Sequence, residues 1–303
     1  MLFEIPVIFH SQGVPLAGRF LRTTESLDER QPAVIVVGSW LTVKEQMAFA
    51  YGRKLAEAGY AAFVFDFAGF GQSDGEPRQA EIPRRKIEDI RSAAEYIRTV
   101  SFVDPESVGC VAICASAQYV LAALAEGAPI RSFASVAGWY HDLASVAAFY
   151  GGQGGVERRL GRAREALDKY ARNRELVLAP AYADGDERAG MHVRLDYYAR
   201  ADRGAVPTWR NEMAEMTWFY WFTFDGLAAA ERVSTPTLFV HSDGCVFPDN
   251  VKQVYGRVQG PKELVWASGA QIDFYDQPEQ VEQALGAIRR WFERTLAGRP
   301  VAV

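Results

Sequence analysis

The segment Val108–Ala117 joins a continuous apolar run, a sharp turn and the start of a helix, and this junction constrains the fold most. The run Val108–Ile113 is typical of a strand that is buried on both faces of a sheet. Cys114 stands at the turn, and the small residues Ala112 and Ser116 beside it let neighbouring backbone segments approach closely. A buried strand that leads directly into a helix predicts a mostly parallel sheet with helices on both faces.

Further apolar runs predict the other strands of this sheet, and they alternate with helical segments along the chain. The predicted strands are Val14–Arg22, Ala33–Val37, Ala61–Phe67, Ser132–Ala137, Pro236–His241 and Glu263–Ala267. Apolar residues recur at helical spacing at Ile87, Ile90, Ala94 and Ile97, and again at Val281, Leu285, Ile288 and Phe292. This alternation predicts an α/β fold of about eight strands, with functional loops at the carboxyl ends of the strands.

The alternation breaks between residues 143 and 226. This segment opens with the glycine-rich stretch Gly151–Gly155, continues as a charged helical run, and ends in the aromatic cluster Trp218–Phe222. We interpret the charged run as a solvated helix face. The sequence therefore predicts a core formed by residues 1–142 and 227–303, with a helical cap, or lid, of residues 143–226 inserted into it.

Composition and charge exclude several classes of partner. The net charge is −5, with Lys and Arg spread along the chain, which argues against nucleic acid as the main partner. No stretch approaches the roughly 20 apolar residues of a membrane span, and the first residues lack a signal-peptide pattern. The three cysteines have neither metal-ligand nor disulfide spacing. We expect a cytoplasmic protein with a small-molecule substrate and without a metal or organic cofactor; a homodimer stays open.

Three segments, in order and correctly spaced, resemble the α/β-hydrolase superfamily, and the likeness extends over nearly the whole chain. They are Gly38–Gln46, Phe65–Gly71 and Ile113–Ala117. Within the superfamily they look like a bacterial branch related to dienelactone hydrolases and to fungal polyketide-transferase-like hydrolases. The resemblance implies an α/β-hydrolase fold. It implies an activity among esterase, lactonase, thioesterase, acyl-transfer and non-hydrolytic reactions.

Cys114 occupies the nucleophile position of the small-x-nucleophile-x-small elbow. The helix that starts after it favours a thiolate, which is a strong nucleophile, whereas a buried structural cysteine is the alternative. The resemblance implies an oxyanion hole made by the N–H of Ala115 and an N–H of the turn around Trp40. Ser73 also lies in a G-x-S-x-G pattern, but no helix follows it, so we interpret Ser73 as a turn residue.

The general base of the expected triad is missing. Asp243 follows the strand Pro236–His241 and fits the acid, although many relatives place the acid two residues further on, where this chain has Cys245. Gln271 stands where the resemblance implies a histidine. Glutamine cannot accept a proton at neutral pH, but it can orient a thiol or water.

Two residues are candidates to replace the missing base. His141 follows a predicted strand and could act as base or polariser, oriented by Asp142 or Asp243; a structural histidine that anchors the cap is the alternative. Glu45 lies near the oxyanion turn, where it could contact Cys114, or it could form a charge pair with Lys44 at a helix start. His192, in the cap, could touch substrate or simply pack there.

Aromatic residues around these loops predict an apolar substrate cavity. The predicted substrate-binding residues are Trp40, Glu45, Trp139, Tyr140, Trp218 and Trp221. The first functional interpretation is hydrolysis or acyl transfer on an ester, lactone or thioester through a thioester on Cys114. The alternatives are enolate-stabilising chemistry, such as C–C cleavage, isomerisation or cyclisation, and a ligand-binding protein without turnover.

Overall fold

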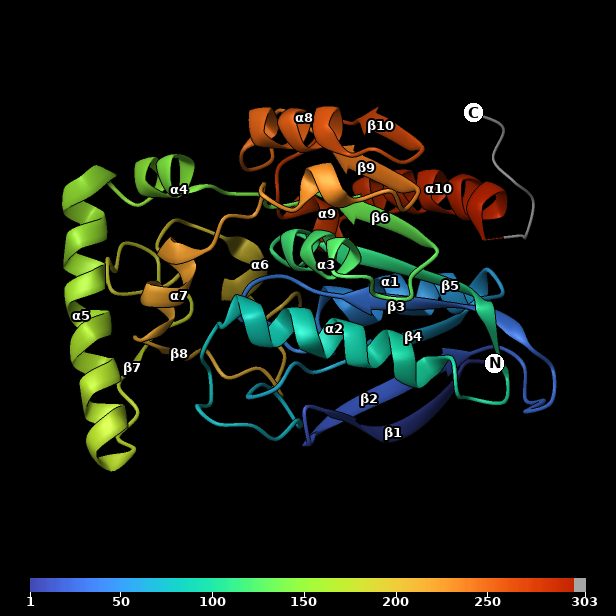
Figure 1. The fold of residues 1–303 in the computed structure, drawn as a ribbon, viewed down its shortest axis with the longest axis horizontal. Helices are drawn as coiled ribbons and strands as arrows, with labels where there is room; N and C mark the ends of the chain where they lie inside the picture. The colour runs from blue at the N-terminus through green and yellow to red at the C-terminus, as the bar shows by residue number, and fades with distance from the viewer. Residues whose placement is uncertain (297–303) are drawn as a thin grey trace.

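The computed structural model describes residues 1–296 and contains an eight-stranded sheet with the order β1-β2-β4-β3-β5-β6-β9-β10 (Figure 1). The strands are β1 (Phe3–Ser11), β2 (Val14–Arg22), β3 (Gln31–Val37), β4 (Ala61–Phe65), β5 (Val103–Ile113), β6 (Ser132–Val136), β9 (Thr237–His241) and β10 (Lys262–Trp266). The pairs from β4 to β10 are parallel, and β1 and β2 are antiparallel. The predicted fold class is confirmed.

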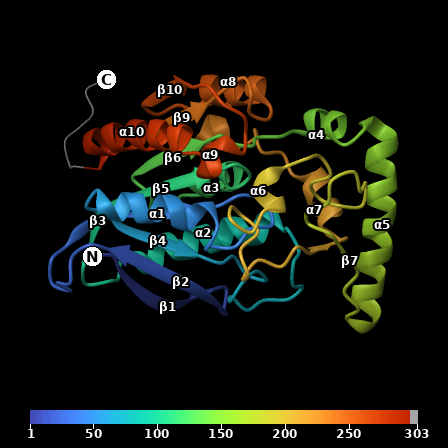
Figure 2. The same cartoon turned by 180° about the vertical axis from the view of Figure 1, so that it is seen from behind.

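Helices cover both faces of the sheet. In the core these are α1 (Met47–Glu57), α2 (Pro83–Ile97), α3 (Ser116–Ala125), η1 (Ala230–Arg232), α8 (Pro248–Arg257), α9 (Asp273–Asp276) and α10 (Pro278–Thr295). Helices α2 and α3 lie on the face seen in Figure 1, and α1 and α10 on the opposite face, seen in Figure 2. The apolar spacings predicted α2 and α10, whose apolar sides are buried against the sheet.

Strand β1 was absent from the sequence prediction. Its residues alternate between more and less exposed, and it pairs with β2 alone, at the edge of the sheet. An edge strand tolerates Pro6, which cannot donate to a ladder and weakens the strand signal in the sequence. The tight turn that joins β1 to β2, at Gln12 and Gly13, takes positive φ angles.

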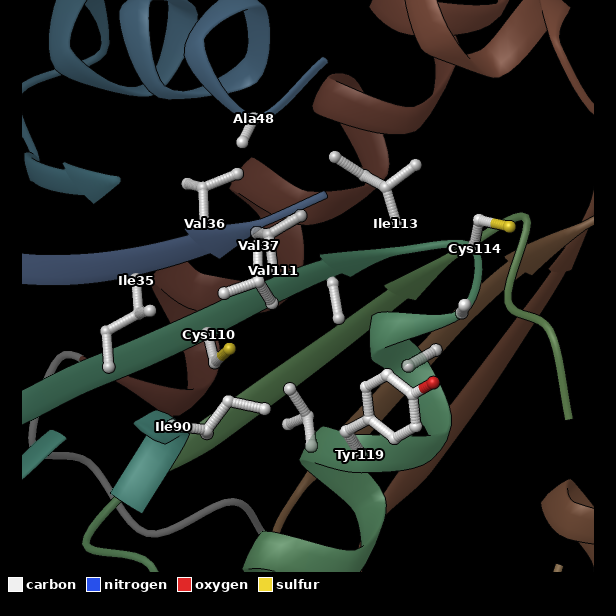
Figure 3. Packing of buried hydrophobic residues seen from close by; sticks show 14 of the residues in the cluster. Ile35, Val36, Val37, Ala48, Ile90, Cys110, Val111, Ile113, Cys114 and Tyr119 are labelled. Atoms are coloured by element: carbon white, nitrogen blue, oxygen red, sulfur yellow. The ribbon is translucent and has the colours of Figure 1, made fainter. Parts of the chain in front are cut away.

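The core lies on both sides of the central strands β3 and β5. Figure 3 shows Cys110 on β5 among aliphatic side chains, including Ile35 and Ile90, and it is fully buried. Cys110 is therefore a core residue. Cys114 lies just past the end of the same strand, where the chain turns into α3.

The segment between β6 and β9 extends beyond the carboxyl ends of the strands (Figure 1). Its elements are α4 (Leu143–Phe149), α5 (Gly152–Asn173), β7 (Leu178–Ala179), α6 (Asp196–Ala199), β8 (Met213–Ala214) and α7 (Thr217–Thr223). Helix α5 packs against α4 and α7. The segment is less helical than expected, because residues 174–216 are mostly loop. We call residues 143–226 the cap below; the division into core and cap remains a prediction.

Candidate active site

The turn after β5 holds Cys114 in a backbone conformation that side chains rarely adopt, with φ of +57°. The N–H of Cys114 donates to the carbonyl of Val136 on β6 at 3.1 Å, and its carbonyl accepts from the N–H of Trp139 at 2.9 Å. These hydrogen bonds from the neighbouring strand and loop hold the strained turn in place. The junction has the strand–turn–helix geometry that the sequence predicted.

Cys114 lines an apolar cavity of about 150 Å³ between the sheet and the cap. From the core the cavity is lined by Ser39, Trp40, Cys114, Trp139, Val246, Gln271, Ile272 and Tyr275. From the cap it is lined by Phe149, Tyr150, Gly190, Met191, His192, Val193, Leu195, Tyr198 and Trp221. The few polar groups therefore lie within a mostly aromatic and aliphatic wall, as in many small-molecule sites.

Gln271 is held rigidly beside the thiol. Its Oε1 accepts from the N–H of Val246 at 3.1 Å, and its Nε2 donates to the carbonyl of Ala137 at 2.8 Å and to Tyr275 Oη at 3.2 Å. Tyr275 Oη also lies 3.4 Å from Ser39 Oγ. The amide is thus a fixed donor at the position where the resemblance implies an imidazole.

Burial raises the pKa of the Cys114 thiol above its ordinary value of 9.0. Hydrogen bonds from Ser39, Tyr275 and Gln271, and the N–H of Ala115, oppose this shift but do not overcome it. Desolvation outweighs these donors, so the shift opposes the thiolate that the helix start was expected to favour. The thiol is neutral at neutral pH.

His141 does not line the cavity and is fully buried. Its Nδ1 accepts from Trp139 Nε1 at 2.7 Å, and its Nε2 donates to the carbonyl of Trp221 at 3.0 Å. Burial lowers the pKa of His141 to about 4. Both ring nitrogens are occupied, so the structure contradicts the proposed base role. His141 instead joins the core residue Trp139 to the cap helix that carries Trp221.

Asp243 is exposed and does not line the cavity. After β9 the N–H of Val246 donates to Gln271 Oε1 at 3.1 Å and the carbonyl of Gly244 accepts from the N–H of Gln271 at 3.2 Å, whereas Asp243 is exposed to solvent. Cys245 is buried, and Ser242 Oγ donates to its Sγ. The structure therefore does not bring Asp243 to the cavity that Cys114 lines.

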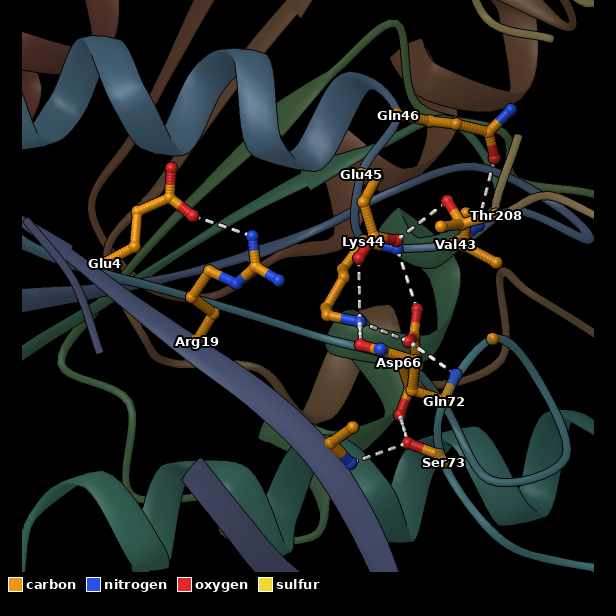
Figure 4. A network of polar contacts seen from close by, with 12 residues as sticks. Glu4, Arg19, Val43, Lys44, Glu45, Gln46, Asp66, Gln72, Ser73 and Thr208 are labelled. Carbon is orange, nitrogen blue, oxygen red and sulfur yellow. Dashed lines mark hydrogen bonds and ion pairs between the residues drawn. The ribbon is translucent and has the colours of Figure 1, made fainter. Parts of the chain in front are cut away.

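Glu45 pairs with Lys44 at 2.9 Å and accepts a hydrogen bond from Thr208 of the cap at 3.3 Å (Figure 4). Lys44 also pairs with the buried Asp66 at 2.6 Å. Glu45 does not line the cavity, so it is neither a base nor a substrate contact there. The charge pair that the sequence offered as an alternative is present.

The predicted aromatic contacts divide into two groups. Trp40, Trp139 and Trp221 line the cavity, with Trp40 and Trp221 rings 4.7 Å apart. Tyr140 and Trp218 do not line it. Tyr140 is buried in the core, where its Oη donates to Ser135 Oγ at 2.9 Å, and Trp218 packs on Trp40, Tyr150 and Phe222.

The oxyanion turn is fixed by a buried ion pair. Leu41 has φ of +57°, and its N–H donates to Glu81 Oε2 at 3.2 Å. Glu81 also pairs with Lys86 at 2.8 Å and accepts from Tyr119 Oη on α3. Within residues 1–296 no acceptor is found for the N–H of Trp40, and the N–H of Ala115 contacts the thiol itself. Both backbone donors therefore lie where a ligand oxygen at the thiol could accept from them.

Ser73 is a turn residue, as predicted. Its Oγ donates to the carbonyl of Asp66 at 2.5 Å and accepts from the N–H of Ala17 at 2.8 Å (Figure 4). It is buried and does not line the cavity.

Sequence reasoning gave no role to Tyr275, Tyr198 or Ser39, which surround the thiol. Tyr275 lies four residues after Gln271, a helical spacing that brings the two side chains together. Tyr198 is on α6 of the cap, and no sequence signal places it opposite Cys114. His192 was considered as a substrate contact, and it lines the cavity.

No helix within residues 1–296 combines the length and the apolar character that crossing a membrane requires. In the same range, no three His, Cys, Asp or Glu side chains gather as metal ligands would.

Comparisons with known proteins show similar sequences and a similar fold. The dienelactone hydrolase family model matches residues 18–166. The uncharacterized protein YcjY of Escherichia coli is 28% identical over 267 residues, covering 84% of this chain and 85% of YcjY. Acyltransferase drtE of Aspergillus calidoustus is 26% identical over 268 residues, 80% of each chain. The crystal structure of the α/β hydrolase GrgF from Penicillium sp. sh18 superposes with a TM-score of 0.82 at 19% identity, covering 97% of this chain and 99% of GrgF.

The structure has the fold of the α/β hydrolases, and residues 18–166 resemble the dienelactone hydrolase family, as the sequence resemblance implied. Its relatives include an acyltransferase and two polyketide transferases by name. These matches indicate an enzyme of the hydrolase or acyltransferase kind.

Proposed function

We propose that this protein is a cysteine-dependent acyl-transfer enzyme that acts on an ester, lactone or thioester of a small molecule. The observation that carries the proposal is Cys114, held at a positive-φ turn on the wall of an apolar cavity, with the N–H of Ala115 at the thiol and the N–H of Trp40 without an acceptor in residues 1–296. A nucleophile that lies beside preorganised N–H groups suits attack on a carbonyl, since those groups stabilise the oxyanion.

The proposed first half-reaction forms a thioester on Cys114. The sulfur attacks the carbonyl carbon, and the N–H groups of Ala115 and Trp40 bind the developing oxyanion. The bond to the leaving alcohol or thiol then breaks, and the leaving group takes up the proton that the Cys114 thiol loses. Gln271 and Tyr275 orient the sulfur through hydrogen bonds but do not accept its proton.

The second half-reaction favours transfer over hydrolysis. Gln271 cannot activate water, and neither His141 nor Asp243 reaches the cavity. Water also has few polar partners in a cavity walled by Trp40 and Trp221. A bound acceptor gains from apolar contacts that water lacks, so we propose that the thioester persists until an acceptor molecule takes the acyl group.

The chemical character of the cavity suggests the substrate class. The rings of Trp40, Trp139 and Trp221 offer flat apolar surfaces to an aromatic or medium-length acyl group. Among the described residues that line the cavity, none carries a charge apart from His192 when that residue is protonated. We therefore propose a neutral, largely apolar acyl donor.

The test is the mass of the intact protein after brief exposure to a panel of activated esters and acyl thioesters. We expect an acyl adduct that maps to Cys114, is absent in Cys114→Ala, and forms normally in the matched control Cys245→Ala. Faster loss of the adduct with an alcohol or thiol than with water alone would support transfer. Absence of an adduct with every donor, while Cys114 still reacts with an alkylating agent, would reject covalent catalysis.

A second candidate function is non-covalent stabilisation of an enolate. It is favoured by the neutral thiol and by the hydroxyl groups of Ser39, Tyr198 and Tyr275 that surround it. Such an enzyme would convert its substrate without an adduct and would lose activity in Tyr275→Phe.

A further inference from the structure

His192 lies in the wall of the Cys114 cavity, although it belongs to the cap loop between β7 and α6. The loop is fixed by backbone hydrogen bonds from Ala183 to Met191 at 3.1 Å and from Gly185 to His192 at 3.0 Å. Gly190 approaches the ring of Trp40 so closely that a Cβ there would lie 2.7 Å from it. The imidazole is therefore held at the cavity by the loop backbone.

The ring of His192 has no hydrogen-bond partner in the described part of the chain, and its Nδ1 is buried. The rings of Tyr150 and Phe149 lie 5.8 Å and 6.5 Å from it. This differs from His141, whose two nitrogens are both occupied by protein groups. A half-buried imidazole without a protein partner is free to bind a proton or a ligand hydroxyl.

The surroundings of His192 favour its neutral form. Burial lowers its pKa below the ordinary value of 6.5, and the positive charge of Arg159 on α5 lowers it further. Glu187, on the same cap loop, opposes this shift, and Tyr150 presents a neutral phenol. The imidazole can therefore accept a proton at neutral pH.

Among the described residues that line the cavity, His192 is the one side chain able to act as a base near neutral pH. The others are apolar, hydroxyl, thiol or amide side chains. Cys114 is only 4% exposed, whereas Phe149 and Val193, which flank His192 in space and in sequence, are 37% and 46% exposed. The cavity thus runs from the buried thiol to a rim at which His192 lies.

We propose that His192 is the catalytic base for the acceptor molecule, and that this acceptor is an apolar alcohol. The inference rests on the proposed acyl-transfer function. An alcohol that enters past Phe149 would place its hydroxyl between the imidazole and the acyl group. Alcohols need a base to become nucleophilic, and the apolar wall selects an alkyl or aryl group over water.

In this step the proton that the acceptor loses is passed on within the site. The acceptor oxygen attacks the thioester carbonyl while its proton passes to a ring nitrogen of His192. The bond between carbon and the Cys114 sulfur then breaks, and the protonated imidazole returns that proton to the departing thiolate. The products are an ester and a neutral thiol, so both residues are ready for another cycle.

The experiment starts from protein that has been acylated on Cys114 with an excess of an activated thioester and then freed of donor. Loss of the adduct is followed by mass with hexanol, with benzyl alcohol and with buffer alone. We expect these alcohols to accelerate the loss in the unaltered protein, and His192→Gln and His192→Asn to lower the alcohol-dependent rate by about 100-fold. The matched control His10→Gln changes an exposed histidine on β1 and keeps the full rate.

A series of rate measurements at different pH values distinguishes a catalytic role of His192 as a base from a purely structural role. Because the pKa of His192 is lowered, the alcohol-dependent rate of the unaltered protein falls only at pH values below the ordinary imidazole range, where His192 becomes protonated, whereas the residual rate of His192→Gln lacks this step. If the adduct forms but both variants transfer as fast as the unaltered protein, the assignment of His192 is overturned while the thioester mechanism stands. If no adduct forms on Cys114 in the unaltered protein, the proposed function falls, and this inference with it.

Discussion

Gln271 Nε2 donates to the carbonyl oxygen of Ala137 at 2.8 Å, which fixes an amide where the family resemblance implies a histidine. The opposite end of the same amide accepts from Val246. Because both ends of the side chain are bound, Gln271 cannot swing away to admit another base. The position is therefore a rigid donor to the thiol region, and proton acceptance must come from elsewhere in the cavity.

Gln271→His restores an imidazole beside Cys114. We expect the acyl adduct to be hydrolysed about tenfold faster or more in this variant, because the imidazole can activate water. The decay of the adduct in buffer, followed by mass, measures the effect. Gln271→Ala is the control, since it removes the amide without supplying a base. Equal decay in the two variants would mean that water does not reach the thioester at this position.

The thiol of Cys114 should react as a neutral group at neutral pH. Burial raises its pKa above 9.0, so alkylation by iodoacetamide should increase steadily up to that pH and beyond, without a plateau near neutrality. The rate is measured by mass in a Cys110→Ala, Cys245→Ala background. A plateau below about pH 7 would instead show a stabilised thiolate.

The buried imidazole of His141 is neutral in the folded protein at neutral pH, and its protonation in acid destabilises the fold. Its folded pKa of about 4 lies below the ordinary 6.5, so the unfolded state binds the proton first as pH falls. The contribution of His141 to the free energy of unfolding is complete above about pH 6.5. It decreases by about 3 kcal/mol as the pH falls toward 4. His241, whose pKa is also lowered to about 4, adds a loss of the same sign.

Urea unfolding of His141→Gln at about pH 7.5 and about pH 5 measures this contribution. We expect the variant to lose less stability between the two pH values than the unaltered protein, and to form the adduct on Cys114 normally. If the variant loses as much stability between the two pH values as the unaltered protein, other groups cause the effect. If the folded variant forms no adduct on Cys114, His141 takes part in the reaction.

Glu81 stabilises the oxyanion turn and neutralises Lys86, and both side chains are at most 1% exposed. Glu81→Ala leaves a buried charge and frees the N–H of Leu41, so we expect a loss of about 3–5 kcal/mol in the free energy of unfolding. Arg84→Ala, which removes an exposed partner of Glu126, should cost about 0–1 kcal/mol. Urea denaturation compares them, and a similar loss in both variants would contradict the role of burial.

The sequence by itself determined the sheet and the turn that carries Cys114. Buried parallel strands are continuous apolar runs, and the turn needs small neighbours at fixed positions, so local residue order carries both signals. It also predicted that Gln271 stands where the resemblance implies a histidine, because the loop that bears it keeps its order along the chain. The sequence did not predict the edge strand β1, because an alternating strand that contains Pro6 gives a weak pattern.

Only the tertiary structure decided which side chains meet Cys114. His141 follows a strand at the correct edge, yet Trp139 and Trp221 occupy both of its nitrogens. Asp243 follows β9 as expected, but a turn of a few residues directs it to solvent. Tyr198 and His192 reach the cavity from the cap. Hydrogen-bond saturation, loop direction and packing between distant segments are properties of the folded chain, and residue spacing does not encode them.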